Sequence, residues 1–146
     1  IAAGSLLVAC SKDKFNTVPE IKFKSLSPNA YVKTGFVNTS VTPKLTIELT
    51  DAEGDFGDTS YVYITNLLNA PHTLDSVLFP KITGISKKNL SVNVQVDFEH
   101  GQILTSPPLA LPRPYVDTVF YEVYVKDQAK NKSNTISVGP VYLISE

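Results

Sequence analysis

An alternation of apolar and polar residues over residues 89–98 constrains the fold of this chain more than any other feature of its sequence. Every second residue of that segment is apolar, and the residues between are Ser, Asn, Gln and Asp. Successive side chains of a β-strand point to opposite faces, so the pattern predicts a strand with one face in a core and the other in solvent. The predicted core face comprises Leu90, Val92, Val94, Val96 and Phe98.

The same period of two recurs along the chain and predicts an all-β fold. Segments that alternate, or that are rich in aromatic and β-branched residues, lie at residues 20–26, 44–50, 60–65, 118–126 and 135–144, with weaker candidates at 31–37 and 102–105. Turns rich in Gly, Pro, Asn and Asp separate them, and no segment has a helical period of useful length. Short strands of this kind form antiparallel sandwiches or barrels. About seven strands in a chain of 146 residues favour an antiparallel immunoglobulin-like β-sandwich.

The alternation also predicts which side chains share the core. In two of the strands the expected core faces are Leu45, Ile47 and Leu49, and Val119, Tyr121, Val123 and Val125. Gly139 and Pro140 interrupt the last predicted strand. Because proline has no backbone N–H, we expect that strand to lie at a sheet edge or to bulge at this point.

The segment Tyr121–Asn134 is a predicted strand followed by a turn of the form D-x-A-x-N-x-S-N. It resembles the last hairpin of bacterial immunoglobulin-like and fibronectin-type modules. The chain has no Trp and one Cys, so it lacks the Cys…Trp…Cys pattern of antibody domains, as those bacterial modules do. The resemblance implies a closing hairpin, with the loops of one end of the sandwich gathered together.

An acidic loop is predicted directly after the strand at residues 44–50. It carries four carboxylates with glycines between them, at Asp51, Glu53, Asp55 and Asp58. Ca²⁺ is bound by six to eight oxygen ligands in flexible geometry, so this loop is a candidate calcium site. The spacing is not that of an EF-hand. The alternative is a solvated turn whose side chains cap their own backbone.

Two residues of the closing hairpin could complete such a site. Asp127 and Asn131 supply further oxygen atoms, and Asp127 is included among the candidate metal ligands. They lie either beside the acidic loop or at the opposite end of the sandwich, and the sequence leaves both arrangements open.

The beginning of the chain has the layout of an export signal. Residues 1–9 are small or apolar and are followed by Cys10, the one cysteine of the chain, and then by a charged segment. Leu7–Cys10 resembles the lipobox of bacterial lipoproteins. The resemblance implies that residues 1–9 are a signal peptide, that Cys10 is lipidated, that residues 10–17 are a tether, and that residues 18–146 form the domain. It also implies anchoring in the outer membrane, on the cell surface or the periplasmic face.

Other interpretations of this beginning are a buried strand, a plain signal peptide or a single membrane-spanning anchor. A spanning helix needs about 20 apolar residues. The apolar run here is about half that length before it meets charge, which favours the lipoprotein interpretation.

Two tripeptides resemble the "D-S/T-aliphatic" O-glycosylation sites of some bacteria that make such lipoproteins. They are centred on Ser76 and Thr118, each preceded by Asp and followed by Val. The resemblance implies glycosylation at these two hydroxyls. The alternative is a chance match, with Thr118 at the start of a strand.

Charge and motifs exclude several classes of function. The net charge of −1 provides no basic surface for nucleic acid. The chain contains no H-E-x-x-H, P-loop or G-x-S-x-G motif, so we expect a protein that is not an enzyme. The first hypothesis is a non-catalytic binding or structural module with Ca²⁺ as its stabilising ion. The second is a glycan-binding accessory lipoprotein of a nutrient-uptake system, and the third is an envelope hydrolase.

Overall fold

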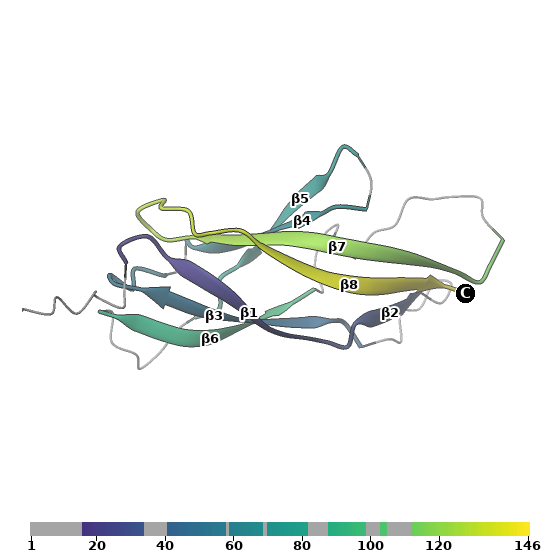
Figure 1. Cartoon of the computed structure of the whole chain (residues 1–146), viewed down its shortest axis with the longest axis horizontal. Helices are drawn as coiled ribbons and strands as arrows, with labels where there is room; N and C mark the ends of the chain where they lie inside the picture. The colour runs from purple at the N-terminus through teal and green to yellow at the C-terminus, as the bar shows by residue number, and fades with distance from the viewer. Residues whose placement is uncertain are drawn as a thin grey trace, which may run out of the picture.

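Every regular element in the described part of the chain is a β-strand. The computed structural model describes residues 16–33, 41–57, 59–68, 70–81, 88–98, 103–104 and 112–146. These residues form eight strands in two sheets, without a helix among them (Figure 1). The all-β prediction is confirmed. The predicted signal segment and Cys10 lie outside the described residues.

The smaller sheet has three antiparallel strands. In spatial order they are β1 (Glu20–Ser27), β3 (Lys44–Asp51) and β6 (Leu90–Asp97). The central strand, β3, is fully paired with β6 from Lys44 opposite Asp97 to Asp51 opposite Leu90.

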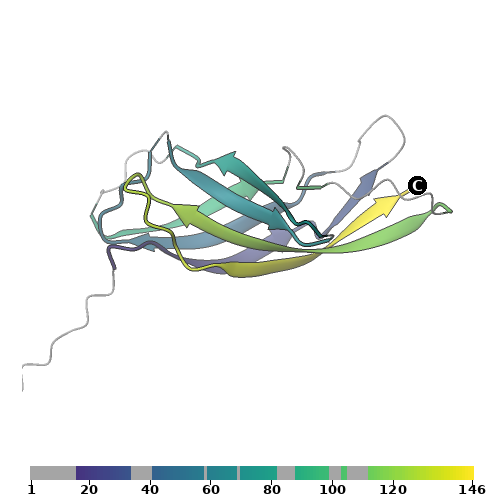
Figure 2. The ribbon, with the colours of Figure 1, turned by 90° about the horizontal axis from the view of Figure 1, so that it is seen from above.

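The larger sheet has five strands. In spatial order they are β2 (Ala30–Lys33), β8 (Ile136–Ser145), β7 (Tyr115–Lys126), β4 (Tyr61–Asn66) and β5 (Thr73–Leu78). All neighbours are antiparallel except β2 and β8, which run parallel. Figure 2 shows this sheet in front of the smaller one, so the two form separate layers.

One apolar core lies between the layers, and the predicted core faces supply it. Leu45, Ile47 and Leu49 of β3 are fully buried, as are the four alternating residues from Val119 to Val125 of β7. In β6, Leu90, Val94 and Val96 are buried, and Phe98 follows the strand as a buried residue. The apolar faces of the two sheets therefore pack against each other, which is the arrangement of a sandwich.

The largest fully buried side chain, Tyr121, has a partner for its hydroxyl group. Its ring meets Phe98 edge-on with centroids 5.0 Å apart, and its O–H donates to the carbonyl of Ile103 at 2.9 Å. Asn66 donates its side-chain N–H to the same carbonyl at 3.1 Å. Buried polar atoms are tolerated when they are hydrogen-bonded in this way.

Two strand predictions differ from the structure. Ile103 and Leu104 form a turn, so the strand predicted at 102–105 is wrong in its two described residues. Residues 73–78 form β5, which the alternation of apolar residues did not predict. This strand lies at the end of the sheet order, and its outward residues Leu74 and Leu78 are each 54% exposed. Because its leucines face outward, this strand lacks the apolar core face by which the other strands were identified.

The predicted irregularity at Gly139 and Pro140 is a β-bulge within the sheet. Val119 pairs with Val141 and Tyr121 pairs with Val138, so two residues of β8 lie opposite the single residue Phe120. Gly139 has a φ of 131°, and a Cβ built on it would lie 2.9 Å from the backbone oxygen of Val119. The strand lies between β2 and β7, so the bulge, and not an edge position, accommodates the proline.

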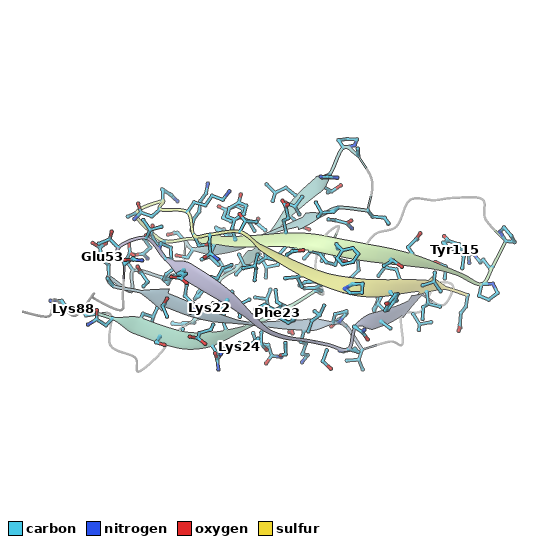
Figure 3. The ribbon with its side chains drawn as sticks, viewed as in Figure 1. Lys22, Phe23, Lys24, Glu53, Lys88 and Tyr115 are labelled. Carbon is cyan, nitrogen blue, oxygen red and sulfur yellow. The ribbon has the colours of Figure 1, made fainter. Side chains whose placement is uncertain are left out.

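The end of the molecule where the described chain begins also carries the β3–β4 and β7–β8 loops (Figure 1). Ala52, just after β3, donates its N–H to the carbonyl of Asn16 and accepts from the N–H of Asn89, both at 2.9 Å. The C-terminus lies at the opposite end (Figure 1), as does Tyr115 (Figure 3). Among the described residues, no helix is long and apolar enough to cross a membrane.

Candidate metal site

Three carboxylates converge at the end of the sandwich where the described chain begins. Asp51 is the last residue of β3, Asp55 lies in the following loop, and Asp127 comes directly after β7. One oxygen atom of each lies within 4.8 Å of the others. We call Asp51, Asp55 and Asp127 the acidic cluster. It could hold a metal ion, and its members come from both sheets.

A tight turn after β3 positions the first two carboxylates. The backbone N–H of Gly54 donates to Asp51 Oδ2 at 2.7 Å, closing a turn typical of Asp. Gly54 has a φ of 61°, a conformation that glycine adopts without the steric cost of a Cβ. Gly57 and Ser60 then exchange two hydrogen bonds, at 3.2 Å through Ser60 Oγ and at 2.9 Å through the backbone. The loop therefore has a defined path.

A second turn holds Asp127. Its Oδ1 accepts from the backbone N–H of Asn131 and its Oδ2 from the Asn131 side-chain amide, both at 2.7 Å. Lys130 completes the turn with a φ of 71°. Asn131 is thus a residue that orients Asp127, which is the reason for an asparagine at this place in the D-x-A-x-N turn.

Backbone hydrogen bonds join the two loops, which settles the arrangement that the sequence left open. The N–H of Gln128 donates to the carbonyl of Asp55 at 2.9 Å, and the N–H of Ala129 donates to Asp55 Oδ2 at 3.2 Å. Asp127 and Asn131 therefore lie beside the acidic loop. The contributions of Gln128 and Ala129 come from their backbone, so no side-chain pattern could have indicated them.

Two oxygens of the acidic cluster have no hydrogen-bond partner among the described residues. Asp51 Oδ1 and Asp55 Oδ1 are buried and make no hydrogen bond, and the Asp51 residue as a whole is inaccessible to solvent. Leaving a buried carboxylate oxygen unpaired costs free energy, and buried charges in proteins are paired or coordinate metals. A hydrogen-bond donor or a cation would satisfy these two oxygens.

The electrostatics of Asp51 have the same implication. Burial raises the pKa of its carboxyl group, the hydrogen bond from Gly54 lowers it, and the negative charges of Asp55 and Asp127 raise it again. The net effect is a pKa above the ordinary value of 3.8. A bound cation would reverse both unfavourable effects, since it replaces lost hydration and offsets the mutual repulsion.

The other predicted metal ligands have different positions. Glu53 is exposed at the end of the molecule (Figure 3) and is not part of the acidic cluster. Asp58 lies outside the described residues. Two of the three described loop carboxylates and Asp127 are thus brought together.

The chemistry of the cluster is that of a hard-cation site. Its ligand atoms are carboxylate oxygens only, and such donors suit Mg²⁺, Ca²⁺ and Mn²⁺. Neither imidazole nor thiolate belongs to the cluster, and these are the groups that select zinc and copper.

The two predicted glycosylation residues lie away from the cluster. Ser76 of β5 and Thr118 of β7 are both exposed on the outward face of the five-stranded sheet. Each is within a paired strand, opposite Tyr63 and Tyr142 respectively. Glycosylation at these hydroxyls stays a prediction.

Comparison with known proteins gave no match to any family model, curated protein or solved structure.

Proposed function

We propose that this chain is a non-catalytic immunoglobulin-like module of the cell envelope, stabilised by Ca²⁺ at the acidic cluster and held to the membrane through lipid on Cys10. The observation that carries the proposal is the pair of buried, unpartnered oxygens, Asp51 Oδ1 and Asp55 Oδ1, within a cluster of three carboxylates. A cation is the simplest group that satisfies both oxygens and neutralises the charge.

Calcium suits this cluster better than magnesium. Mg²⁺ needs near-ideal octahedral geometry, keeps several waters and is usually held by one or two carboxylates, whereas Ca²⁺ accepts six to eight oxygens in flexible geometry. Asp51, Asp55 and Asp127 come from a strand end and two loops, which provides an irregular set of oxygens. Water and backbone carbonyls would complete the coordination shell.

The role of the ion would be structural. Asp51 ends a strand of the smaller sheet and Asp127 follows a strand of the larger one, so an ion between them would join the two layers at one end. The first described residues of the chain lie at the same end, where Asn16 accepts a hydrogen bond from Ala52. In an anchored protein, calcium would therefore stiffen the end nearest to the tether.

The order of the strands supports the immunoglobulin-like assignment. In the constant-type form of that fold, one sheet contains strands A, B, E and D and the other contains C, F and G, and variable-type domains add C′ and C″ beside C. Strand D has no counterpart among the described residues. With β1, β3 and β6 as A, B and E, the strands β4, β5, β7 and β8 take the places of C, C′, F and G. β2 then continues strand A along the opposite sheet, parallel to β8.

Glycan binding is not included in the proposal, because the stacked tyrosines of the five-stranded sheet do not form an open platform. A sugar-stacking platform needs aromatic faces open to solvent. Tyr63 and Tyr124 instead stack on each other, with ring centroids 4.9 Å apart and ring planes 9° apart. The ammonium groups of Lys126 and Lys132 lie over Tyr63 and Tyr124, at 5.3 and 4.1 Å from the centroids.

The test of the metal site is a thermal unfolding experiment on the purified chain, kept reduced, in chelator, in Ca²⁺ and in Mg²⁺. A ligand that binds only the folded state stabilises it by about 2.7 kcal/mol at a hundred times its dissociation constant. We expect Ca²⁺ to raise the melting temperature, and Mg²⁺ to raise it less. Asp51→Asn and Asp55→Asn should abolish the response, while Glu53→Gln, in the same loop but outside the cluster, should retain it.

The outcome that would contradict the metal site is a wild-type melting temperature that is the same in chelator and in millimolar Ca²⁺. The anchor is tested separately. Cys10→Ala should move the protein from the membrane fraction to the soluble fraction of the producing bacterium, and its retention in the membrane would refute lipidation at that residue.

A further inference from the structure

The outward face of β5, β4 and β7 carries several large apolar side chains that are exposed to solvent. Leu74 and Leu78 of β5 are each 54% exposed, and Tyr61 of β4 is 38% exposed. Tyr61 pairs with Leu78, and Tyr63 pairs with Ser76 on one side and Tyr124 on the other, so these side chains occupy one continuous face. Contiguous exposed apolar surface of this kind commonly marks an interaction site.

We define the dimer face as Tyr61, Tyr63, Leu74, Leu78 and Tyr124, with Glu122 and Lys126 at its two ends. The charges are placed symmetrically. Glu122 and Lys126 lie two residues before and two residues after Tyr124 on the same outward side of β7. Opposite them on β4 are Thr65 and Tyr61. Along β7 the face therefore presents an acid, an aromatic residue and a base. The distance from Glu122 to Lys126 is about 13 Å, at about 3.3 Å per residue.

This pattern is complementary to itself. A two-fold axis that lies between two copies, perpendicular to the strands at the level of Tyr124, reverses the strand direction while keeping β7 opposite β7. Lys126 of one copy then faces Glu122 of the other, and the reverse pair forms at the other end. An isologous interface requires this kind of pairing, in which one patch recognises itself.

The charged groups are available for such pairs. The ion pairs of Lys22, Lys24 and Lys44 all lie on the smaller sheet, so they do not engage Lys126 or Glu122. The ammonium groups of Lys126 and Lys132 lie 5.3 and 4.1 Å from the ring centroids of Tyr63 and Tyr124, within the same face. Glu122 is exposed at one end of the face.

We propose that this face binds a second copy of the same chain, forming a two-fold dimer in which the five-stranded sheets pack face to face. The stacked tyrosines and the two leucines form the apolar centre, and two Lys126–Glu122 pairs fix the antiparallel register. The dimer leaves the acidic cluster free, because Asp51, Asp55 and Asp127 lie at the end of the sandwich.

The test is the molar mass of the purified 146-residue chain, measured by light scattering in chelator over a concentration series, with reducing agent to prevent a disulfide through Cys10. We expect twice the chain mass of 15.9 kDa at high concentration. Glu122→Lys and Lys126→Glu should each raise the dimer dissociation constant at least tenfold, because each change places like charges opposite one another twice. The combined variant E122K/K126E should restore dimerisation, since the pairs re-form with exchanged signs.

Lys22→Glu is the matched control, because Lys22 is an exposed lysine of the smaller sheet and makes the same change of charge. It should leave the dissociation constant unchanged, and circular dichroism should show that every variant is folded. A chain that stays monomeric throughout would overturn the proposal, as would folded single variants with unchanged mass or a combined variant as weak as the singles. Because the series is run in chelator, failure of the calcium proposal would leave this result unaffected.

Discussion

Tyr121 and Asp51 are both fully buried residues with polar side chains, and the difference between them distinguishes the middle of the molecule from its acidic end. The hydroxyl of Tyr121 finds the carbonyl of Ile103, so the chain itself satisfies it. Oδ1 of Asp51 finds no partner among the described residues. The chain itself satisfies the hydroxyl buried in the middle of the sandwich, whereas in our proposal a bound cation satisfies the buried carboxylate of the acidic end. Stability should therefore be independent of ions in one region and dependent on them in the other.

The largest loss of stability is expected from a substitution in the core between the two sheets. Tyr121→Ala removes a fully buried ring and its contact with Phe98, and a loss of about 3–5 kcal/mol is typical for aromatic core residues. Urea unfolding should show the same loss in chelator and in Ca²⁺. Tyr142→Ala, at an exposed tyrosine, should change stability by less than about 0.5 kcal/mol.

A milder variant covers the case in which Tyr121→Ala does not fold. Tyr121→Phe keeps the ring and removes only the hydrogen bond to Ile103, so a loss of about 1 kcal/mol is expected. A loss that depended on Ca²⁺ would contradict the separation of the two regions.

The second prediction concerns the acidic end: Asp51→Asn should lower the stability of the protein in Ca²⁺ but not in chelator. In Ca²⁺, Asp51→Asn removes a ligand and should abolish the gain from the ion, about 2.7 kcal/mol at a hundred times the dissociation constant. In chelator the same variant should be as stable as the wild type or more stable, because it removes a buried charge that Asp55 and Asp127 repel. Asn still offers an oxygen to Gly54. Melting curves in the two solutions give the comparison directly, and destabilisation in chelator equal to that in Ca²⁺ would contradict it.

The third prediction compares the loss of stability when each of two glycines is replaced by alanine. Gly139→Ala places a Cβ 2.9 Å from the backbone oxygen of Val119 at a φ of 131°, and strain of this kind costs about 1–3 kcal/mol. Gly57→Ala would meet only the end of the Gln128 side chain, which can move away, so its cost should be smaller. Equal losses in chemical unfolding would mean that the bulge of β8 tolerates a side chain.

The parts of the fold that the sequence predicted are those in which burial affects one face of a strand. β3, β6 and β7 alternate because one face of each meets the core, and their core residues were predicted individually. β5 was missed because Leu74 and Leu78 point outward and Asp75 occupies the inward side. Its pairing with β4 depends on backbone hydrogen bonds, and these have no side-chain signature.

The candidate site was predictable to the extent that it is local. Asp51 and Asp55 were identified from their spacing around Gly54, but that spacing also included Glu53, which the turn leaves exposed. The approach of Asp127 depends on the order of strands in two sheets and on the backbone contacts of Gln128, so its position could not be decided from sequence. The burial of Asp51 had the same origin.

The smallest expected effect is the pH dependence of stability, which should differ between the metal-free and the Ca²⁺-bound acidic cluster. The pKa of Asp51 is raised in the folded, metal-free chain, so its folding contribution is fully present below the unfolded value near 3.8 and is lost as the pH rises through the raised pKa. In chelator, wild type should therefore gain stability relative to Asp51→Asn as the pH falls from 7 towards 4. In Ca²⁺ the slope should reverse, because protons compete with the ion for the carboxylates. Melting curves of both proteins across this range measure the two slopes, and slopes of the same sign would mean that no ion binds through Asp51.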